Sequence, residues 1–288
     1  MILFVIGVGS AVVFLLLSDN QLFQTLDEDS YILYEKQYDK DRFDEIELDF
    51  LNRDYEVYAS ADDQIHIEYY LTDKDHVKIE EEEDSLEIEN SIRWFEQIFS
   101  GWNWNISRSY FVVKLYLPAN ESYDVSLETA NGDIQIMDVS VLSELEIKTA
   151  NGNIICDQVD AINVDVKTSN GEIRFTDVSV LNEMKVRTSN GKIKLNDVSA
   201  QSIDGATSNG DITAEQIETE SIELDSSNGD VILSIYGDKE AFEVTLDSSN
   251  GDLFYDGIEV AQEHFNPDGV YTISLDSSNG DVSVTFIQ

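Results

Sequence analysis

A short phrase built around an Asn-Gly pair occurs eight times between residues 129 and 282, for example as "TANGDI", "TSNGEI" and "SSNGDV". Successive copies lie 20, 19, 20, 19, 19, 22 and 29 residues apart. A period of about 20 residues is typical of a solenoid, in which each repeat forms one coil that packs against its neighbours. The asparagines of these pairs are Asn131, Asn151, Asn170, Asn190, Asn209, Asn228, Asn250 and Asn279.

A β-hairpin is the alternative, because Asn-Gly also suits a tight type I′ turn. A hairpin, however, gains nothing from the same Thr or Ser two residues before Asn in every copy. In a solenoid, equivalent residues lie about 4.8 Å apart, so that asparagines hydrogen-bond and threonines pack in continuous ladders. The repeat therefore predicts an all-β, parallel β-solenoid (β-helix) of about eight coils of 19–20 residues. Glycine is expected at the corner because φ is positive there and a Cβ would meet the next coil.

The chain divides into four predicted parts. Residues 126–288 hold the Asn-Gly solenoid, and residues 41–125 alternate apolar and polar residues as half-buried strands do. Because the open end of a solenoid exposes unpaired strand edges, we expect 41–125 to cap the first coil. Residues 19–40 are predicted to be an acidic linker, although "YILYEKQY" has enough aromatic residues to form an added strand.

The first 18 residues are predicted to be directed to a membrane. The run "MILFVIGVGSAVVFLLL" has no charged side chain, and as a helix it would be about 25 Å long, close to the thickness of a bilayer core. A cleaved signal sequence is the alternative, but no basic residues precede the run and no clear cleavage pattern follows it. We therefore expect a single transmembrane helix, with the bulk of the chain outside the cell.

The charge of the chain excludes one large class of partners. It has 59 acidic and 17 basic residues, a net charge of −42, which repels nucleic acid and anionic lipid headgroups. A high-salt habitat and a strongly hydrated surface domain both fit this composition. The single cysteine, Cys156, lies in the apolar stretch "GNIICDQV" and is expected to be a buried structural thiol.

The sequence resembles a known family. The acidic, alternating segment that ends in "FVVKLYLP", followed by "SLETANGDIQI" and iterated "TSNGDI" coils, is similar to the putative-adhesin family of bacterial and archaeal β-strand-repeat surface proteins, the DUF4097 type. The resemblance covers roughly residues 40–288. It implies a right-handed β-helix at the cell surface, membrane anchoring in some members, and a link to cell-envelope stress. It implies no catalytic residues.

Acidic residues directly follow several Asn-Gly pairs, and they are the weak candidates for metal binding. Stacked carboxylates about 4.8 Å apart repel each other, and Ca²⁺ or Na⁺ would relieve this repulsion. The simpler interpretation, which we favour, is that Asp is a turn residue whose side chain bonds to its own backbone, while salt screens the remaining repulsion. No other cofactor is expected. The candidates are Asp133, Asp211, Asp230, Asp252 and Asp281.

Three tryptophans, Trp94, Trp102 and Trp104, lie in the aromatic segment 93–111. We expect this segment to be a hydrophobic plug over the first coil. The alternative is a loop that stacks on sugars or sits at a membrane interface.

Two classes of function follow from these patterns. The favoured one is a non-enzymatic cell-surface protein, tethered to the membrane, that binds a cell-wall polymer or a membrane protein, since solenoids offer extended surfaces. The alternative is a polysaccharide-acting enzyme on a β-helix scaffold. The sequence offers no catalytic residue, because its three histidines do not have the spacing of a metal or general-base site.

Overall fold

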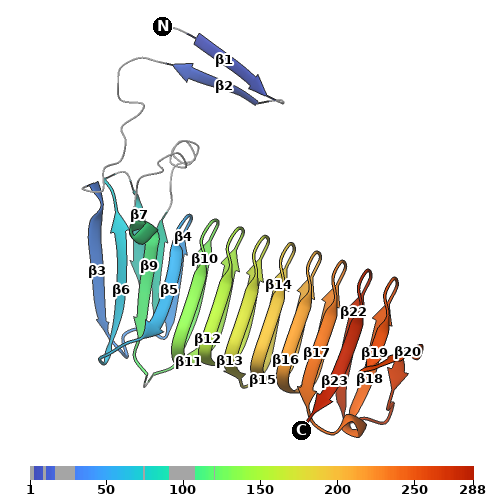
Figure 1. Ribbon diagram of the computed structural model, residues 1–288. Helices are drawn as coiled ribbons and strands as arrows, with labels where there is room; N and C mark the ends of the chain where they lie inside the picture. Colours follow the sequence, from blue (N-terminus) through green and yellow to red (C-terminus); the bar gives the residue numbers. More distant parts are fainter. Residues whose placement is uncertain (1–2, 9–10, 17–29, 74, 91–107, 120) are drawn as a thin grey trace.

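The computed structural model describes residues 1–288 except 1–2, 9–10, 17–29, 74, 91–107 and 120. Stacked strands form a rod, with the N-terminal strands at one end and the C-terminal strands at the other (Figure 1). Strands β3 to β23 belong to one hydrogen-bonded sheet that winds along this rod. The prediction of an all-β protein is confirmed.

The central strands pair in parallel at the predicted period. The first half of each long strand stacks on the first half of the next, with Ile134 opposite Ile154 and then Ile173. The hairpin alternative is wrong, because the central strands that flank the Asn-Gly pairs form only parallel pairings with one another, and a hairpin requires an antiparallel pair across the turn. We call each coil a rung and name it by its Asn. The central strands are β10 (Tyr123–Thr129), β11 (Ile134–Thr149), β12 (Ile154–Thr168), β13 (Ile173–Val180), β14 (Glu183–Thr188), β15 (Ile193–Thr207) and β16 (Ile212–Ser226).

Each central rung bends at a residue with positive φ, but this residue is not the corner glycine. The φ values of these residues lie between 53° and 57°. The expectation of positive φ at the Asn-Gly corner is therefore wrong for six of the eight corner glycines, and the other two, Gly210 and Gly229, have φ of 159° and 158°, close to extended backbone. The left-handed position instead carries Asp or Gln, at Asp138, Gln158, Asp177, Asp197 and Gln216.

The rungs continue before residue 126. Strands β4 and β5 form a rung next to that of Asn131, because β4 pairs in parallel with β10 and β5 with β11. Strands β8 and β9 stack in parallel on the outer side of β4 and β5. The order in space is therefore β8–β9, β4–β5 and then β10–β11. The bounds are β4 (Glu45–Phe50), β5 (Asp54–Ala59), β8 (Ser85–Asn90) and β9 (Val112–Leu117).

Antiparallel strands cover this N-terminal end. Strand β6 pairs with β9, β3 pairs with β6, and β7 pairs with β8. The predicted cap, 41–125, thus supplies both rungs and covering strands, and β3, which contains all of the aromatic "YILYEKQY" except Tyr31, adds a strand from the predicted linker. The tryptophans Trp94, Trp102 and Trp104 fall outside the described residues. The bounds are β3 (Ile32–Asp39), β6 (Gln64–Leu71), β7 (Val77–Glu81) and a 3₁₀ turn η2 (Arg108–Phe111).

The C-terminal end also departs from chain order. Strands β22 and β23 lie between two earlier rungs, since β22 pairs with both β16 and β18, and β23 pairs with both β17 and β19. Short antiparallel strands β20 and β21 cover the outermost rung. The bounds are β17 (Val231–Tyr236), η3 (Lys239–Ala241), β18 (Phe242–Ser248), β19 (Leu253–Tyr255), β20 (Ile258–Val260), β21 (His264–Phe265), β22 (Tyr271–Ser277) and β23 (Val282–Ile287).

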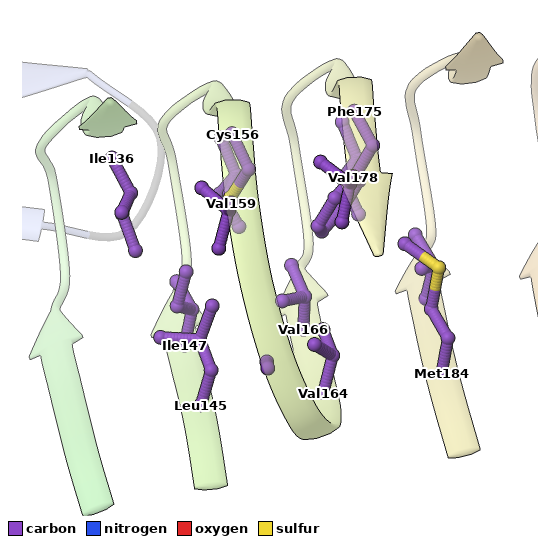
Figure 2. Close-up of a cluster of buried hydrophobic side chains, with 14 of the residues drawn as sticks. Ile136, Leu145, Ile147, Cys156, Val159, Val164, Val166, Phe175, Val178 and Met184 are labelled. Carbon is purple, nitrogen blue, oxygen red and sulfur yellow. The ribbon is translucent and has the colours of Figure 1, made fainter. Parts of the chain in front are cut away.

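The core is a set of apolar columns that runs along the rod. Cys156 lies in one column between Ile136 and Phe175, and all three side chains are 0% exposed (Figure 2). Burial raises the pKa of the Cys156 thiol well above its usual range, so that it stays protonated and unreactive. The prediction of a buried structural thiol is confirmed.

The N-terminal residues differ from the prediction. They form two antiparallel strands, β1 (Leu3–Val8) and β2 (Ala11–Leu16), in place of a transmembrane helix. Their valines, isoleucine and phenylalanines favour strands, and the glycines at 7 and 9 disfavour a helix. Within the described part of the chain, no helix has the length and apolar character to cross a membrane.

Candidate binding surfaces of the solenoid

The eight asparagines of the repeat lie in one column at a corner of the rod. The side-chain amide of each Asn donates a hydrogen bond to the side-chain oxygen of the Asn in the neighbouring rung, over 2.6–3.1 Å. The order follows space and not sequence, because Asn279 donates to Asn228 and Asn250 donates to Asn279. At the other end the column closes on Asn52.

The glycines beside this column bring successive rungs close together. A Cβ built on Gly171 would lie 1.8 Å from the carbonyl oxygen of Gly152, and each corner glycine meets its neighbour in the same way. The expectation that the corner has no room for a Cβ is thus confirmed. The Thr or Ser before Asn donates a hydrogen bond to the same glycine carbonyls; for example, the Thr168 hydroxyl donates to the Gly152 oxygen over 3.1 Å. The repeated Thr/Ser-x-Asn-Gly phrase therefore satisfies the backbone where the rungs are most tightly packed.

Arg53 ends the glycine column. It occupies the corner position that Gly132 has in the next rung, yet its side chain is only 6% exposed. The guanidinium donates to the carbonyls of Tyr110 and Tyr70, over 2.9 and 3.2 Å, and lies over the Phe111 ring. Burial lowers the pKa of Arg53. The sequence "LNRD" at residues 51–54 could have indicated this rung, since it has the Asn and Asp of "ANGD" with Arg53 in place of the glycine.

The acidic residues after Asn-Gly bond to the backbone of the next rung. The Asp133 carboxylate accepts the amide N–H of Asn153 over 2.8 Å, and that of Asp230 accepts the N–H of Asp281 over 2.9 Å. These bonds link neighbouring rungs, and thus differ from the turn interpretation, in which each side chain bonds to its own backbone.

The five weak metal candidates share this column but are not contiguous. Asp133 is separated from the others by Asn153, Glu172 and Lys192. The remaining four are consecutive in space, in the order Asp211, Asp230, Asp281 and Asp252. Among the residues that the structure describes, no three His, Cys, Asp or Glu side chains are grouped so that they could hold a metal ion.

One outer face of the rod has its charges in blocks. We define the charge row as the outward residues two positions before the Ala or Ser of each corner and their partners in register. From the N-terminal end it has three acids, three bases, an alanine and three acids. The residues are Glu89, Asp49, Glu128, Lys148, Lys167, Arg187, Ala206, Asp225, Asp276 and Asp247.

Crowding within the acidic blocks changes their protonation. Partial burial, with the charges of Glu128 and Glu89, raises the pKa of Asp49 to about 6. Partial burial and the charges of Glu223 and Asp276 also raise the pKa of Asp225. These carboxylates repel each other along the row.

A hollow of about 350 Å³ opens where the charge row meets the serine corners, and we call it the corner groove. It lies around Ala206, whose small side chain leaves a gap between Arg187 and Asp225. Arg187 bonds to Asp204 over 2.5 Å on one side of this gap. Serine hydroxyls line the groove along the corner, from Ser189, Ser208, Ser227 and Ser278. The groove thus offers positive, negative and hydroxyl groups over several rungs.

The profile of the Toastrack DUF4097 family matches residues 43–285, nearly all of the rungs described above. The chain belongs to this family. The resemblance predicted from the repeat is therefore confirmed. No curated protein matches this sequence.

Solved structures resemble this chain at low sequence identity. A putative adhesin from Bacteroides fragilis is 14% identical and has a TM-score of 0.52, with 89% of this chain and 97% of that chain covered. A putative lipid binding protein from Parabacteroides distasonis is 15% identical, with the same coverage and a TM-score of 0.48. A putative adhesin from the same organism is 14% identical, again with that coverage, and its TM-score is 0.43. At 14% identity, the likeness to the Bacteroides fragilis structure shows the fold alone.

Proposed function

We propose that this Toastrack protein is a non-enzymatic binding protein at the cell surface, held at the membrane by its apolar N-terminal residues. Its ligand is a cell-wall polymer or a membrane protein partner. No cofactor is needed for this role. The net charge of −42 disfavours nucleic acid as a ligand.

The observation that carries the proposal is the unbroken Asn column, from Asn52 to Asn250, which holds the rungs in one register. Beside it the corner groove repeats its hydroxyls at the spacing of the rungs, about 4.8 Å. A surface of this kind presents the same groups repeatedly to an extended partner, as solenoid binding surfaces do. The fold shared with a putative adhesin supports the same role.

The test is retention of the full-length protein by purified cell wall and by solubilised membrane of the source organism, at low and at high salt. We expect retention by one of the two. Ala206→Arg fills the corner groove and should abolish retention, whereas Thr213→Arg adds the same side chain to the other face and should not. Absence of retention at both salt concentrations, with the protein folded, would overturn the proposal. Cleavage of wall glycan would favour the polysaccharide-acting enzyme.

A further inference from the structure

A row of three aromatic side chains and a methionine lies near the N-terminal end of the rod, on strands β6, β9 and β5 and the first half of β11. The charge row lies on other strands at this end, namely β8, β4, β10 and the second half of β11. We define the tyrosine row as His66 of β6, Tyr116 of β9, Tyr58 of β5 and Met137 of β11. These residues are direct partners across neighbouring strands: His66 with Tyr116, Tyr116 with Tyr58, and Tyr58 with Met137. The row therefore crosses four strands at one level.

All four side chains point away from the core and are partly exposed. Their chain neighbours Ile67, Leu115, Val57 and Ile136 are buried, at 0–1% exposure. The rings of Tyr58 and Tyr116 have centroids 5.8 Å apart and an interplanar angle of 30°. His66 meets Tyr116 edge-on, with centroids 6.3 Å apart. The two rings, tilted to each other by 30°, thus form an aromatic platform with an imidazole at its edge.

A row of polar groups borders this platform. Two residues along the same strands, the sheet presents Glu68, Lys114, Glu56 and Gln135 at one level. Lys114 lies 3.5 Å from Glu56, and the Tyr58 hydroxyl donates to Glu56 over 3.3 Å. On the other side, His66 bonds to Asp62 over 2.8 Å. Donors and acceptors therefore lie on both sides of the rings.

The platform is confined to these rungs. Farther along the rod, the positions in register with Met137 carry Asp157, Thr176 and Asn196. The repeat itself therefore does not require an aromatic residue at this level. Cross-strand aromatic pairs do stabilise sheets, by roughly 0.2–1 kcal/mol each, and a purely structural role for the tyrosines must be separated from binding by experiment.

We propose that the tyrosine row and its polar neighbours bind a neutral carbohydrate chain. The apolar C–H faces of sugar rings pack on the two tyrosines, and their hydroxyls bond to the flanking carboxylates, amide and ammonium. Adjacent rungs are about 4.8 Å apart, close to the length of one pyranose unit, so neighbouring rings of a chain can stack on neighbouring tyrosines. The acidic surface of the protein repels anionic sugars, which restricts the ligand to neutral chains.

This inference rests on the proposed binding function but uses a different surface from the corner groove. Its test uses purified neutral hexasaccharides, namely cellohexaose, maltohexaose and chitohexaose, with an oligogalacturonate of equal length as the anionic probe. Binding to the full-length protein is measured by calorimetry and by saturation-transfer NMR. We expect at least one neutral probe to bind and the anionic probe not to bind.

Variants locate the site. Tyr58→Thr and Tyr116→Thr keep a strand-forming residue but remove the ring, and each should weaken binding at least about tenfold. Tyr58→Phe and Tyr116→Phe keep the ring and should bind within about threefold of the wild type. Tyr236→Thr removes an exposed tyrosine at the other end of the rod and should have no effect. If a Thr variant fails to fold, competition by the bound sugar against chemical nitration of Tyr58 and Tyr116 in the wild type decides.

Three outcomes would overturn the proposal: no neutral probe binds, the Thr variants bind as well as the wild type, or the anionic probe binds at least as tightly. Protection of neither tyrosine from nitration would count in the same way. Wall retention that is lost in Ala206→Arg but kept in the Tyr→Thr variants would leave the proposed function standing while this inference fails.

Discussion

The middle of the rod and its two ends are built from the same kind of rung, but they differ in how the rungs are ordered and covered. In the middle, from Asn131 to Asn228, chain order and spatial order agree, and identical residues stack on identical residues. At each end the order is permuted, and the covering strands run antiparallel. The repeated residues determine how one rung packs on the next. They cannot determine the structure of an end, because the last rung has no further rung beyond it. The ends therefore depend on residues that occur once, such as Arg53.

The largest effect should come from a corner glycine in the middle. In Gly171→Ala the new Cβ would lie 1.8 Å from the Gly152 oxygen. Neither rung can move away to relieve this clash, because each is packed against a further rung on its other side. We expect a loss of more than about 4 kcal/mol in unfolding free energy, or no folding at all. Gly251→Ala makes a similar clash with Gly280 in the outermost rung, which can move outward, so its loss should be smaller. Urea unfolding followed by circular dichroism measures both, and equal losses would contradict the distinction between middle and end.

Removing the end residue Arg53 should have the next largest effect. Arg53→Ala leaves the carbonyls of Tyr110 and Tyr70 without their donor and opens a space under Phe111. We expect a loss of about 3 kcal/mol in the same unfolding measurement. The matched control is Arg174→Ala, which removes an exposed ion pair with Glu172 and should change stability by less than about 0.5 kcal/mol. A comparable loss in both variants would show that Arg53 has no special role at the end.

The Asn column gives a smaller and graded effect. Asn170 donates to Asn151 and accepts from Asn190, so Asn170→Ala removes bonds on both sides. We expect it to lower stability by about 2 kcal/mol. Asn250 donates to Asn279 at the outer end of the column, and Asn250→Ala should lower stability by about half as much. Thermal unfolding of the two variants side by side tests this order, which would be refuted by a larger effect at Asn250.

The smallest effect should come from the acidic blocks and depend on pH. The pKa of Asp49 is raised to about 6 in the folded protein, so folding favours its protonated form. Its stabilising contribution is complete below the unfolded pKa and is lost as the pH rises through about 6. Asp49→Asn should therefore raise the melting temperature by a few degrees at pH 8 and leave it nearly unchanged at pH 4.

Asp211 provides a control of opposite sign. The hydrogen bond from Lys192 lowers its pKa, so its contribution is present above the unfolded pKa and is lost as the pH falls through the folded pKa. Asp211→Asn should lower the melting temperature at pH 7. If both variants shift the melting temperature in the same direction at neutral pH, the two local environments do not act as described.

The middle of the rod could be predicted well, because the equal spacing of the repeats determines the register in which neighbouring strands pair. Equal spacing of about 20 residues, with β-branched residues at fixed offsets from Asn, leaves a parallel stack as the arrangement that buries every apolar column. The repeat led to a wrong prediction of where the backbone has positive φ. Asn-Gly suggested positive φ at the glycine, whereas the left-handed residue lies at the next bend, where Asp or Gln stands.

The ends could not be predicted in the same way. Spacings of 22 and 29 show that the last coils are longer, but they do not show that the rung of Asn279 lies between those of Asn228 and Asn250. Which edges pair depends on contacts distant in sequence, and no local pattern records them. The apolar N-terminal run was equally ambiguous, because a short run of Val, Ile and Phe fits a helix or strands.

The tyrosine row and the corner groove illustrate the same limit at the level of sites. Tyr58 and Tyr116 are 58 residues apart in the chain, and only the stacking of β5 on β9 makes them neighbours. The groove exists because Ala206 falls in a row of long charged side chains. Tyr58, Tyr116 and Ala206 do not stand out in the sequence, since each contributes to a surface only through its partners in register on neighbouring strands.

The inserted final rung also bears on how the protein is made. Strands β22 and β23 contain residues 271–287, and they fill the slot between two rungs that leave the ribosome before them. Until translation reaches these residues, β16 and β17 on one side and β18 and β19 on the other keep unpaired edges. A chain cut short by a premature stop codon would expose those edges permanently to proteases and chaperones. Closure of the rod thus depends on residues 271–287, because the rungs on both sides of them pair fully only when these residues are present.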